Sequence, residues 1–256
     1  MDYIRINSTL RGPNPLGAYA AIVLALVAAL WALRFKALSR RWRVGTGLLA
    51  GASLVALLAS YSRAAALGAI GALLLVALAV YGRKISRTIC VGAGLAALVA
   101  FGAFYMLKDT QFVSQVVLHQ DPIEGSEVSS NDEHAESLTD GVARMLRQPL
   151  GGGVGSTGSA SLLSDEPLII ENQLLYTAHE AGWVGLVLLV YIQATLLVLL
   201  WARRSYWLAL GVFASGIGLS VIGLVLPVWT DDTVAIIWWG LAAIALGAPL
   251  AKKGRQ

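Results

Sequence analysis

Four polar side chains stand together where a long apolar run begins, in the stretch PLIIENQLLYTAHEAGWVGLVLLV, residues 167–190. They are Glu171, Asn172, His179 and Glu180. Carboxylates and imidazoles are the side chains that most often move protons in enzymes, and the apolar residues that follow are fit to enter a membrane. The pattern therefore places candidate proton-transfer groups where a helix meets the lipid.

These residues also have ordinary structural explanations. The stretch from Glu171 to Glu180 is predicted to start a helix, with Asn172 and His179 on one face. An acid in the first turn of a helix is stabilised by the helix dipole, so Glu171 can simply cap it. A single histidine such as His179 is more often a surface or interface residue than a ligand.

A second group of candidate residues is cationic. Arg63 lies in LLASYSRAAALG, a very short connection between two apolar runs, where an arginine is unfavourable unless it has a partner. It is expected either to extend towards the interface or to act as a fixed cation for a lipid-linked phosphate. Arg11, His134 and Arg144 are further candidates, although Arg144 can instead form an i,i+4 ion pair with Asp140.

Most other classes of chemistry are disfavoured by the motifs. The sequence has no His-Glu-x-x-His pattern and no paired Cys/His set, so we expect no metal site. Residues 153–158 match Gly-x-Gly-x-x-Gly, but a predicted helix precedes them, so neither a dinucleotide nor another cofactor is expected. These glycines indicate either a tight return whose backbone amides approach another group, or a flexible turn.

The composition is that of a polytopic membrane protein. Of the 256 residues, 57% are hydrophobic and 13% are charged, whereas a soluble domain has about 25% charged residues. No ionisable residue lies clearly in the middle of a predicted span, which weakens the hypothesis of a proton-coupled transporter. The single cysteine, Cys90, lies in an apolar run and excludes a disulfide framework.

The chain is predicted to be all-α, a single membrane domain over residues 1–256 with about seven spans. Apolar runs near the required ~17–25 residues occur at residues 16–33, 45–60, 65–82, 89–107, 176–201, 206–227 and 233–250. Glycine and alanine are dense at 45–53 and 68–74, which suits either close helix packing or generic lipid-facing helices.

Basic and acidic residues lie in different connections between the apolar runs. Alternate connections hold 13 of the 19 basic residues and no acid, whereas all 15 acids lie in the other set. The positive-inside rule places the basic connections and the C-terminus in the cytoplasm, so the net charge of +4 reflects topology and not nucleic-acid binding. The basic residues concerned are Arg34, Lys36, Arg40, Arg41, Arg43, Arg83, Lys84, Arg87, Arg203, Arg204, Lys252, Lys253 and Arg255.

One connection, residues 108–175, is long enough to be functional. Within this extracytoplasmic loop, residues 130–147 are predicted to form a helix that Pro149 ends. Ser130 and Glu133 have the spacing of a capping box, and apolar residues at helical spacing form a stripe.

The ordered motifs resemble the O-antigen ligase and polymerase superfamily. They are STLRGPNPLGAY, SYSRAAALG, HAESLTDGVARMLRQPLGGGVGSTG and ENQLLYTAHEAGWVGL, and the similarity extends over nearly the whole chain. The resemblance implies a GT-C-like helical fold. It also implies metal-independent transfer of a glycan from an undecaprenyl diphosphate carrier to an acceptor hydroxyl, on the outer side of the bacterial inner membrane.

The resemblance assigns roles to individual residues. Arg63 is similar to the arginine that binds the diphosphate in this family, with Arg11 or Arg144 in support. Relatives carry a second arginine near the start of the loop helix, where this chain has His134. The relatives' catalytic His-Asn pair corresponds to Glu171-Asn172, so Glu171 would take the acceptor proton and Asn172 would hold it.

The same resemblance implies the partners of the protein. They are a lipid-linked glycan donor, an envelope glycan or lipid acceptor, and the lipid bilayer. Relatives usually have further spans before GPNPLGAY, so an N-terminally truncated member is expected. Ligation and polymerisation both remain open, and the alternative from another class is a transporter or a non-catalytic protein of envelope assembly.

Overall fold

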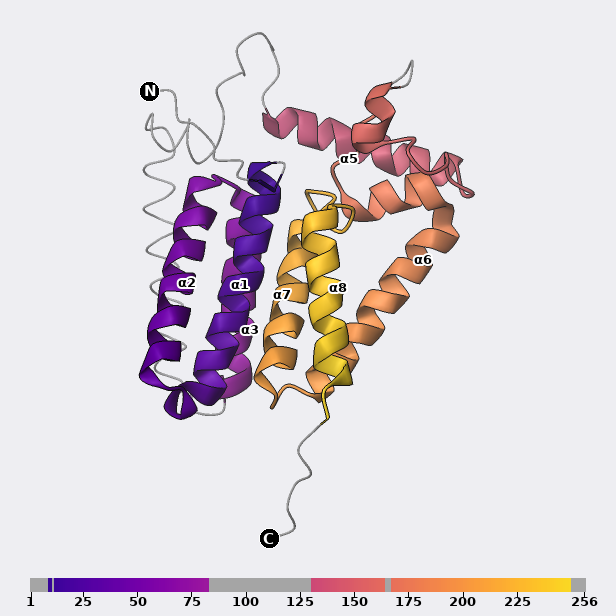
Figure 1. Ribbon diagram of the computed structural model, residues 1–256. Coiled ribbons are helices and arrows are strands. Elements are labelled where there is room, and N and C mark those ends of the chain that lie inside the picture. The colour runs from indigo at the N-terminus through magenta and orange to yellow at the C-terminus, as the bar shows by residue number, and fades with distance from the viewer. Residues whose placement is uncertain (1–8, 11, 83–129, 164–166, 250–256) are drawn as a thin grey trace, which may run out of the picture. The chain divides into compact units, whose positions relative to one another are not determined.

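The computed structural model describes residues 9–10, 12–82, 130–163 and 167–249, and every regular element among them is a helix (Figure 1). The elements are α1 (Pro13–Arg34), η1 (Phe35–Ala37), α2 (Arg40–Ala59), α3 (Arg63–Tyr81), α5 (Ser130–Arg147), η4 (Gly158–Leu163), α6 (Gln173–Ala202), α7 (Trp207–Ile222) and α8 (Asp232–Gly247). The predicted all-α class is confirmed for this part of the chain.

Six of the seven predicted spans coincide with helices, and the seventh, 89–107, lies outside the described residues. Within the described residues, four helices (α1 with η1, α2, α3 and α6) are long and apolar enough to cross a membrane. The apolar helices α7 and α8 have 16 residues each, or about 24 Å at 1.5 Å per residue, less than the ~30 Å hydrocarbon core. The membrane class is thus supported, and the count of seven spans stays a prediction.

The predicted span 206–227 contains a turn that its apolar composition conceals. Helix α7 ends at Ile222, five residues before Pro227. Proline has no N–H and disfavours the helical conformation in the residue before it, so the helix cannot continue through this region. Asp231 then caps α8 by accepting hydrogen bonds from two of its first backbone N–H groups, at 3.0 and 3.1 Å.

The chain forms two compact units. Unit 1 comprises residues 1–77 and 187–256, and unit 2 comprises residues 78–186. In unit 1, α1 packs against α7 and α2, and α7 packs against α8.

Glycines bring the backbones of unit 1 close together. A Cβ added at Gly68 would lie 2.7 Å from the backbone oxygen of Gly218, so α3 and α7 meet at a point where no side chain fits. At Gly71 an added Cβ would contact nothing. Close packing therefore explains only part of the glycine-rich run 68–74, and the lipid-facing alternative fits the rest.

Trp238 is the centre of the core of unit 1. Its side chain is fully buried, and its indole Nε1 donates a 3.0 Å hydrogen bond to the backbone oxygen of Val212. The ring occupies the space above Gly216, where an added Cβ would approach it to 2.5 Å. Trp229 and Trp239 meet it edge-on, with ring centroids 4.9 and 5.2 Å away. The indole thus ties α8 to α7.

The two described basic connections of unit 1, residues 34–43 and 203–204, lie at one end of its helices, the lower end in Figure 1. Arg203, which follows α6, donates hydrogen bonds of 3.4 and 3.1 Å to the last carbonyls of α8, those of Ala245 and Ala248. A cation is favourable at the C-terminus of a helix. The opposite end of the unit carries the first residues of α1 and α3, which begin at Pro13 and Arg63. The separation of charge by connection holds for the described residues of this unit, and which end faces the cytoplasm stays a prediction.

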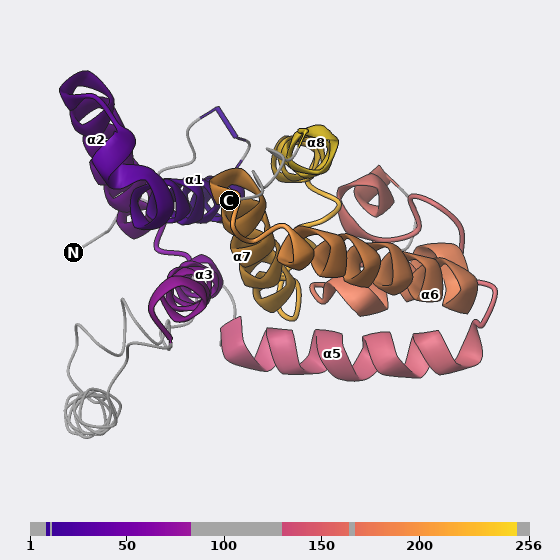
Figure 2. The same cartoon turned by 90° about the horizontal axis from the view of Figure 1, so that it is seen from below.

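The described part of unit 2 consists mainly of α5, the loop after it and the first part of α6. The predicted helix 130–147 is confirmed as α5. Gly182 has φ 68° and ψ −173°, so it breaks α6 into a short arm, residues 173–181, and a long apolar part, residues 183–202. The long part alone supplies the ~20 residues that a span needs, and we assign only this part to the membrane. Within this unit α5 packs against the α6 arm, since a Cβ added at Gly141 of α5 would lie 3.0 Å from Leu175 of the arm; Figure 2 shows these elements from below.

Candidate functional site

The sequence-predicted site residues belong to both units. Arg63 lies in unit 1, and Arg144, Glu171 and Asn172 lie in unit 2. Arg11 lies outside the described residues, as does the side chain of His134, whose backbone belongs to α5.

Asn172, and not Glu171, caps the α6 arm. Its side-chain Oδ1 accepts hydrogen bonds from the backbone N–H groups of Leu174 and Leu175, at 2.9 and 3.1 Å. This satisfies two of the donors that the first turn of any helix leaves without partners. Glu171 precedes the cap and is half-buried. The capping role considered for Glu171 is therefore filled by its neighbour.

The backbone of Glu171 is fixed by α5. Its N–H donates a 3.3 Å hydrogen bond to the hydroxyl of Ser137, which in turn donates to the carbonyl oxygen of Ile169, also at 3.3 Å. Gly141 lies one turn further along α5. A Cβ added at Gly141 would come within 3.0 Å of Leu175, so the glycine leaves room for the leucine side chain. The backbone at Glu171 is thus fixed by the Ser137 hydrogen bond before it and by the packing of Leu175 against Gly141 after it.

Thr157 fixes the segment that leads to Glu171. This fully buried residue donates its hydroxyl to the carbonyl oxygen of Leu168 at 3.0 Å and accepts the N–H of Ile170 at 3.1 Å. Ser161 adds a second hydroxyl that exchanges hydrogen bonds with Leu168, at 2.7 and 3.0 Å. Sequence reasoning missed both residues, because small hydroxyl residues near glycines are ordinary loop composition.

The glycine loop, residues 149–158, binds the end of the α6 arm. Three of its backbone N–H groups donate to the carbonyl oxygens of His179 and Glu180 and to the Glu180 carboxylate, at 2.5, 3.1 and 2.8 Å. A helix broken at Gly182 leaves its last carbonyls without partners in the next turn, and the loop supplies the missing donors. The donors are Gly152, Gly153 and Gly155.

Positive φ angles allow the loop to take this course. Gly151, Gly153, Gly155 and Gly158 have φ between 70° and 97°, a region that side chains with a Cβ rarely adopt. Of the two interpretations of these glycines, the structure supports the tight return, and the group that the amides approach is the protein's own α6.

Glu180 is a structural residue in this arrangement. Its carboxylate accepts the N–H of Gly155 at 2.8 Å and lies near Tyr176, whose hydroxyl donates to the carbonyl oxygen of Thr157 at 3.5 Å. Burial, together with the charge of Glu180, raises the pKa of Tyr176 to about 12. The tyrosine therefore stays a hydrogen-bond donor across the physiological range.

His179 is buried on the α6 arm against the glycine loop. Only 4% of its surface is exposed, and its Nε2 lies 3.2 Å from the position that a Cβ of Gly152 would take. Among the residues that the structure describes, its Nδ1 has no hydrogen-bond partner. Burial lowers the pKa of the imidazole, and the nearby positive charge of Arg144 lowers it further. A neutral imidazole is thus enclosed behind the loop.

Arg144 is paired within its own helix. Its Nε lies 2.6 Å from Oδ2 of Asp140, and both side chains are about half exposed, at 40% and 47%. The ordinary i,i+4 ion pair considered from the sequence is therefore present. Such an exposed pair contributes little to stability, and the guanidinium keeps contact with solvent.

Arg63 is the first residue of α3, directly after a turn made of Ser60, Tyr61 and Ser62. Ser60 donates its hydroxyl to the carbonyl oxygen of Leu57 at 2.7 Å and accepts the N–H of Ser62 at 3.2 Å. Tyr61 takes a positive φ of 51° to close the turn. The backbone at Arg63 is therefore held in a fixed, buried turn, and the arginine itself is half-buried.

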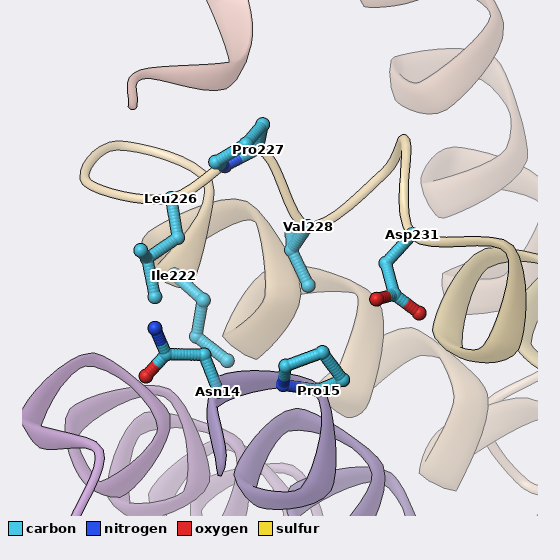
Figure 3. A pocket seen from close by; sticks show the side chains of 7 residues that line it. All are labelled: Asn14, Pro15, Ile222, Leu226, Pro227, Val228 and Asp231. Atoms are coloured by element: carbon cyan, nitrogen blue, oxygen red, sulfur yellow. The ribbon is translucent and has the colours of Figure 1, made fainter. Parts of the chain in front are cut away.

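A cavity of about 200 Å³ lies in unit 1, between the start of α1 and the turn from α7 to α8 (Figure 3). It is lined by Asn14, Pro15, Ile222, Leu226, Pro227, Val228 and Asp231. It lies at the Arg63 end of the unit, since an added Cβ at Gly17 of α1 would approach Ala65 of α3 to 2.7 Å.

The comparisons with known proteins identify a family. A model of the family described as O-antigen ligase matches residues 48–190, more than half of the chain. The match includes Arg63, α5, the glycine loop and Glu171. No curated protein sequence matches the chain. On this match, the protein belongs to the O-antigen ligase family.

Proposed function

We propose that the protein transfers a glycan from a polyprenyl diphosphate carrier to an acceptor hydroxyl at the outer face of the bacterial inner membrane. The observation that carries the proposal is the family match, because residues 48–190 include both Arg63 and Glu171. Helices fit to cross a membrane suit a donor whose lipid tail stays in the bilayer. The acceptor is an envelope glycan or lipid, in ligation or in polymerisation.

In this proposal Glu171 is the general base. The acceptor hydroxyl gives its proton to the Glu171 carboxylate while its oxygen attacks the anomeric carbon of the donor. The bond from that carbon to the diphosphate oxygen breaks, and its electron pair leaves with the diphosphate. No oxidant or reductant is required, and the products are a glycoside and the carrier diphosphate.

The supports around Glu171 suit a base that must hold its place. The hydroxyl of Ser137 holds its N–H, the buried Thr157 fixes the backbone just before it, and Asn172 starts the helix just after it. A side chain on such a fixed backbone loses little freedom when the reaction begins. Asn172 acts here as a positioning residue, through the cap and not through a contact with the acceptor.

Cationic side chains stabilise the leaving diphosphate. Arg63 is the first candidate, because its turn is held by Ser60 and Ser62 and a fixed charge stabilises a developing anion without reorganisation. Arg11, Arg144 and His134 are the supporting candidates. Arg144 would serve through the guanidinium nitrogens other than Nε, which is bound to Asp140.

Transfer of a defined undecaprenyl diphosphate-linked glycan by the full chain in nanodiscs tests this proposal. Glu171→Gln removes the base and is expected to lower the rate by about 10²- to 10⁴-fold, and Arg63→Ala is expected to weaken transfer as well. Arg41→Ala is the matched control, because Arg41 lies at the opposite end of unit 1, near the start of α2. Wild-type rates in both Glu171→Gln and Arg63→Ala contradict the proposal.

A further inference from the structure

We propose that the cavity between α1 and the α7–α8 turn is a saccharide subsite that holds one sugar ring of the donor or of the acceptor. The inference rests on the proposed glycan transfer and adds to it a binding site on residues outside the Glu171 region. Its volume is about 200 Å³, which is smaller than the ~300–1,000 Å³ of typical drug-sized pockets. The cavity is therefore of a size for a small, compact group.

The polar chemistry of the cavity comes mainly from Asp231. Its Oδ1 accepts the backbone N–H groups of Thr233 and Val234, at 3.0 and 3.1 Å, and the Thr233 hydroxyl. Its Oδ2 accepts no hydrogen bond from any residue that the structure describes. A carboxylate oxygen in a cavity wall is an acceptor only, so it suits an occupant that donates hydrogen bonds.

The remaining walls suit the faces of a sugar ring. Pro15 and Val228 approach the cavity from opposite sides, Val228 from the turn and Pro15 from α1 (Figure 3). Apolar surfaces of this kind can cover the C–H face of a pyranose, while a few placed polar groups fix its orientation. Asn14 adds an amide, which both donates and accepts.

Charge argues against the other parts of the donor. A diphosphate is repelled by the Asp231 carboxylate, and a prenyl chain gives that carboxylate no hydrogen-bond donor. A sugar hydroxyl satisfies it, with the added strength that an ionised acceptor gives. The cavity also lies at the Arg63 end of the unit, where the proposed function places the diphosphate to which the donor sugar is attached.

Two substitutions separate the subsite from the structural role of Asp231. Asp231→Asn keeps the cap of α8, because asparagine caps helices as well as aspartate does, and it replaces Oδ2 by an amide donor. Asp232→Asn is the matched control. It removes the same charge from the next residue, which does not line the cavity. Val228→Phe fills the cavity from the turn.

Affinities of the full chain in nanodiscs provide the test, read from tryptophan fluorescence since Trp229 adjoins Val228. One arm compares undecaprenyl diphosphate with the same carrier bearing one hexose or N-acetylhexosamine. The other arm uses methyl glycosides of the same sugars. We expect Asp231→Asn to lower affinity for sugar-bearing probes about tenfold or more and to leave the bare carrier unchanged, with Asp232→Asn like wild type throughout. Val228→Phe is expected to weaken the same probes as Asp231→Asn.

The arms also identify the source of the sugar. A loss confined to the sugar-bearing carrier assigns the subsite to the donor, and a loss confined to the methyl glycosides assigns it to the acceptor. The proposal is overturned if Asp231→Asn binds every probe as wild type does, which would leave only water in the cavity. It is also overturned if the bare carrier is weakened equally, or if no probe shows sugar dependence in wild type.

Failure of the proposed function has a different signature. Arg63→Ala is expected to weaken the bare and the sugar-bearing carrier alike. If Arg63→Ala changes neither affinity and wild type transfers no glycan, the proposed function fails while a sugar-selective loss in Asp231→Asn still supports the subsite. If transfer proceeds and Arg63→Ala weakens binding, but Asp231→Asn has no selective effect, only the subsite fails.

Discussion

The backbone N–H of Gly155 donates a 2.8 Å hydrogen bond to the side-chain carboxylate of Glu180, 25 positions further along the chain. The contact joins the glycine loop to the α6 arm at the point where Gly182 breaks the helix. Glu180 therefore has a structural role. Glu171, the other acid of the same stretch, is the residue for which a catalytic role is proposed.

Glu180→Ala is expected to destabilise unit 2 without removing the proposed base. The substitution deletes the acceptor of the Gly155 N–H, and hydrogen bonds to charged groups contribute about 1.5–3 kcal/mol. Thermal unfolding and limited proteolysis of the glycine loop measure the effect. Asp140→Ala, which breaks an exposed ion pair, is the control and should change stability by ~0–1 kcal/mol.

Unchanged proteolysis of the loop in Glu180→Ala contradicts this assignment. So does a transfer rate in the milder variant Glu180→Gln that falls as far as in Glu171→Gln, since a purely structural acid should cost stability before it costs turnover.

Gly182→Ala is expected to be among the most damaging changes in the chain. The residue has φ 68°, and an added Cβ would lie 2.6 Å from the backbone oxygen of Pro149. Strain of this kind costs roughly 1–3 kcal/mol, to which the displaced loop adds. Gly71→Ala is the matched control, because its Cβ enters open space. Equal yields and melting temperatures of the two variants in detergent would contradict the structural argument.

Much of the helical architecture follows from sequence because its causes are local. Apolar runs of sufficient length predict α1, α2, α3 and α6, and the helix 130–147 follows from its polar and apolar periodicity and from Pro149. The Asp140–Arg144 pair, one of the two alternatives for Arg144, is equally local, since residues four apart lie about one turn apart on a helix. The boundaries are less local: α2 begins at Arg40, with Ser39 as its cap, and not at residue 45.

The site is less predictable because its parts meet only in the folded chain. The cap is an exception, because asparagine is a preferred N-cap residue and glutamate is not, so the local sequence ENQ could have selected Asn172. Thr157 acquires its role only when residues 168–170 fold back onto it. The break at Gly182 lies within an apolar run, and a glycine by itself does not predict a break in a helix. The Asp231 cavity requires α1 and α7 to pack together, which no single segment encodes.

Asn172→Asp and Asn172→Ala are expected to differ, if Asn172 acts through its cap. Aspartate caps as well as asparagine, whereas alanine costs about 0.5–2 kcal/mol. Stability should therefore fall in Asn172→Ala and be retained in Asn172→Asp, with transfer following the same order. Thermal unfolding and steady-state kinetics on both variants measure this. A stable Asn172→Asp variant with a strongly reduced kcat would instead indicate that the amide touches the reacting groups.

The buried His179 makes the stability of unit 2 depend on pH. Burial and the charge of Arg144 lower the pKa of its imidazole, against the opposing charges of Glu180 and Asp140. Below its unfolded pKa of about 6.5, the unfolded chain binds a proton that the folded protein does not. Stability is thus fully present above that pH and falls as the pH drops through it.

His179→Gln should flatten this dependence in melting temperatures measured between about pH 5.5 and 7.5, a range in which most carboxylates stay ionised. His119 and His134 are common to both proteins, so the difference in slope isolates His179 even if the variant is less stable at every pH. Parallel slopes for wild type and variant would show that the imidazole is protonated as readily in the folded protein as in the unfolded chain.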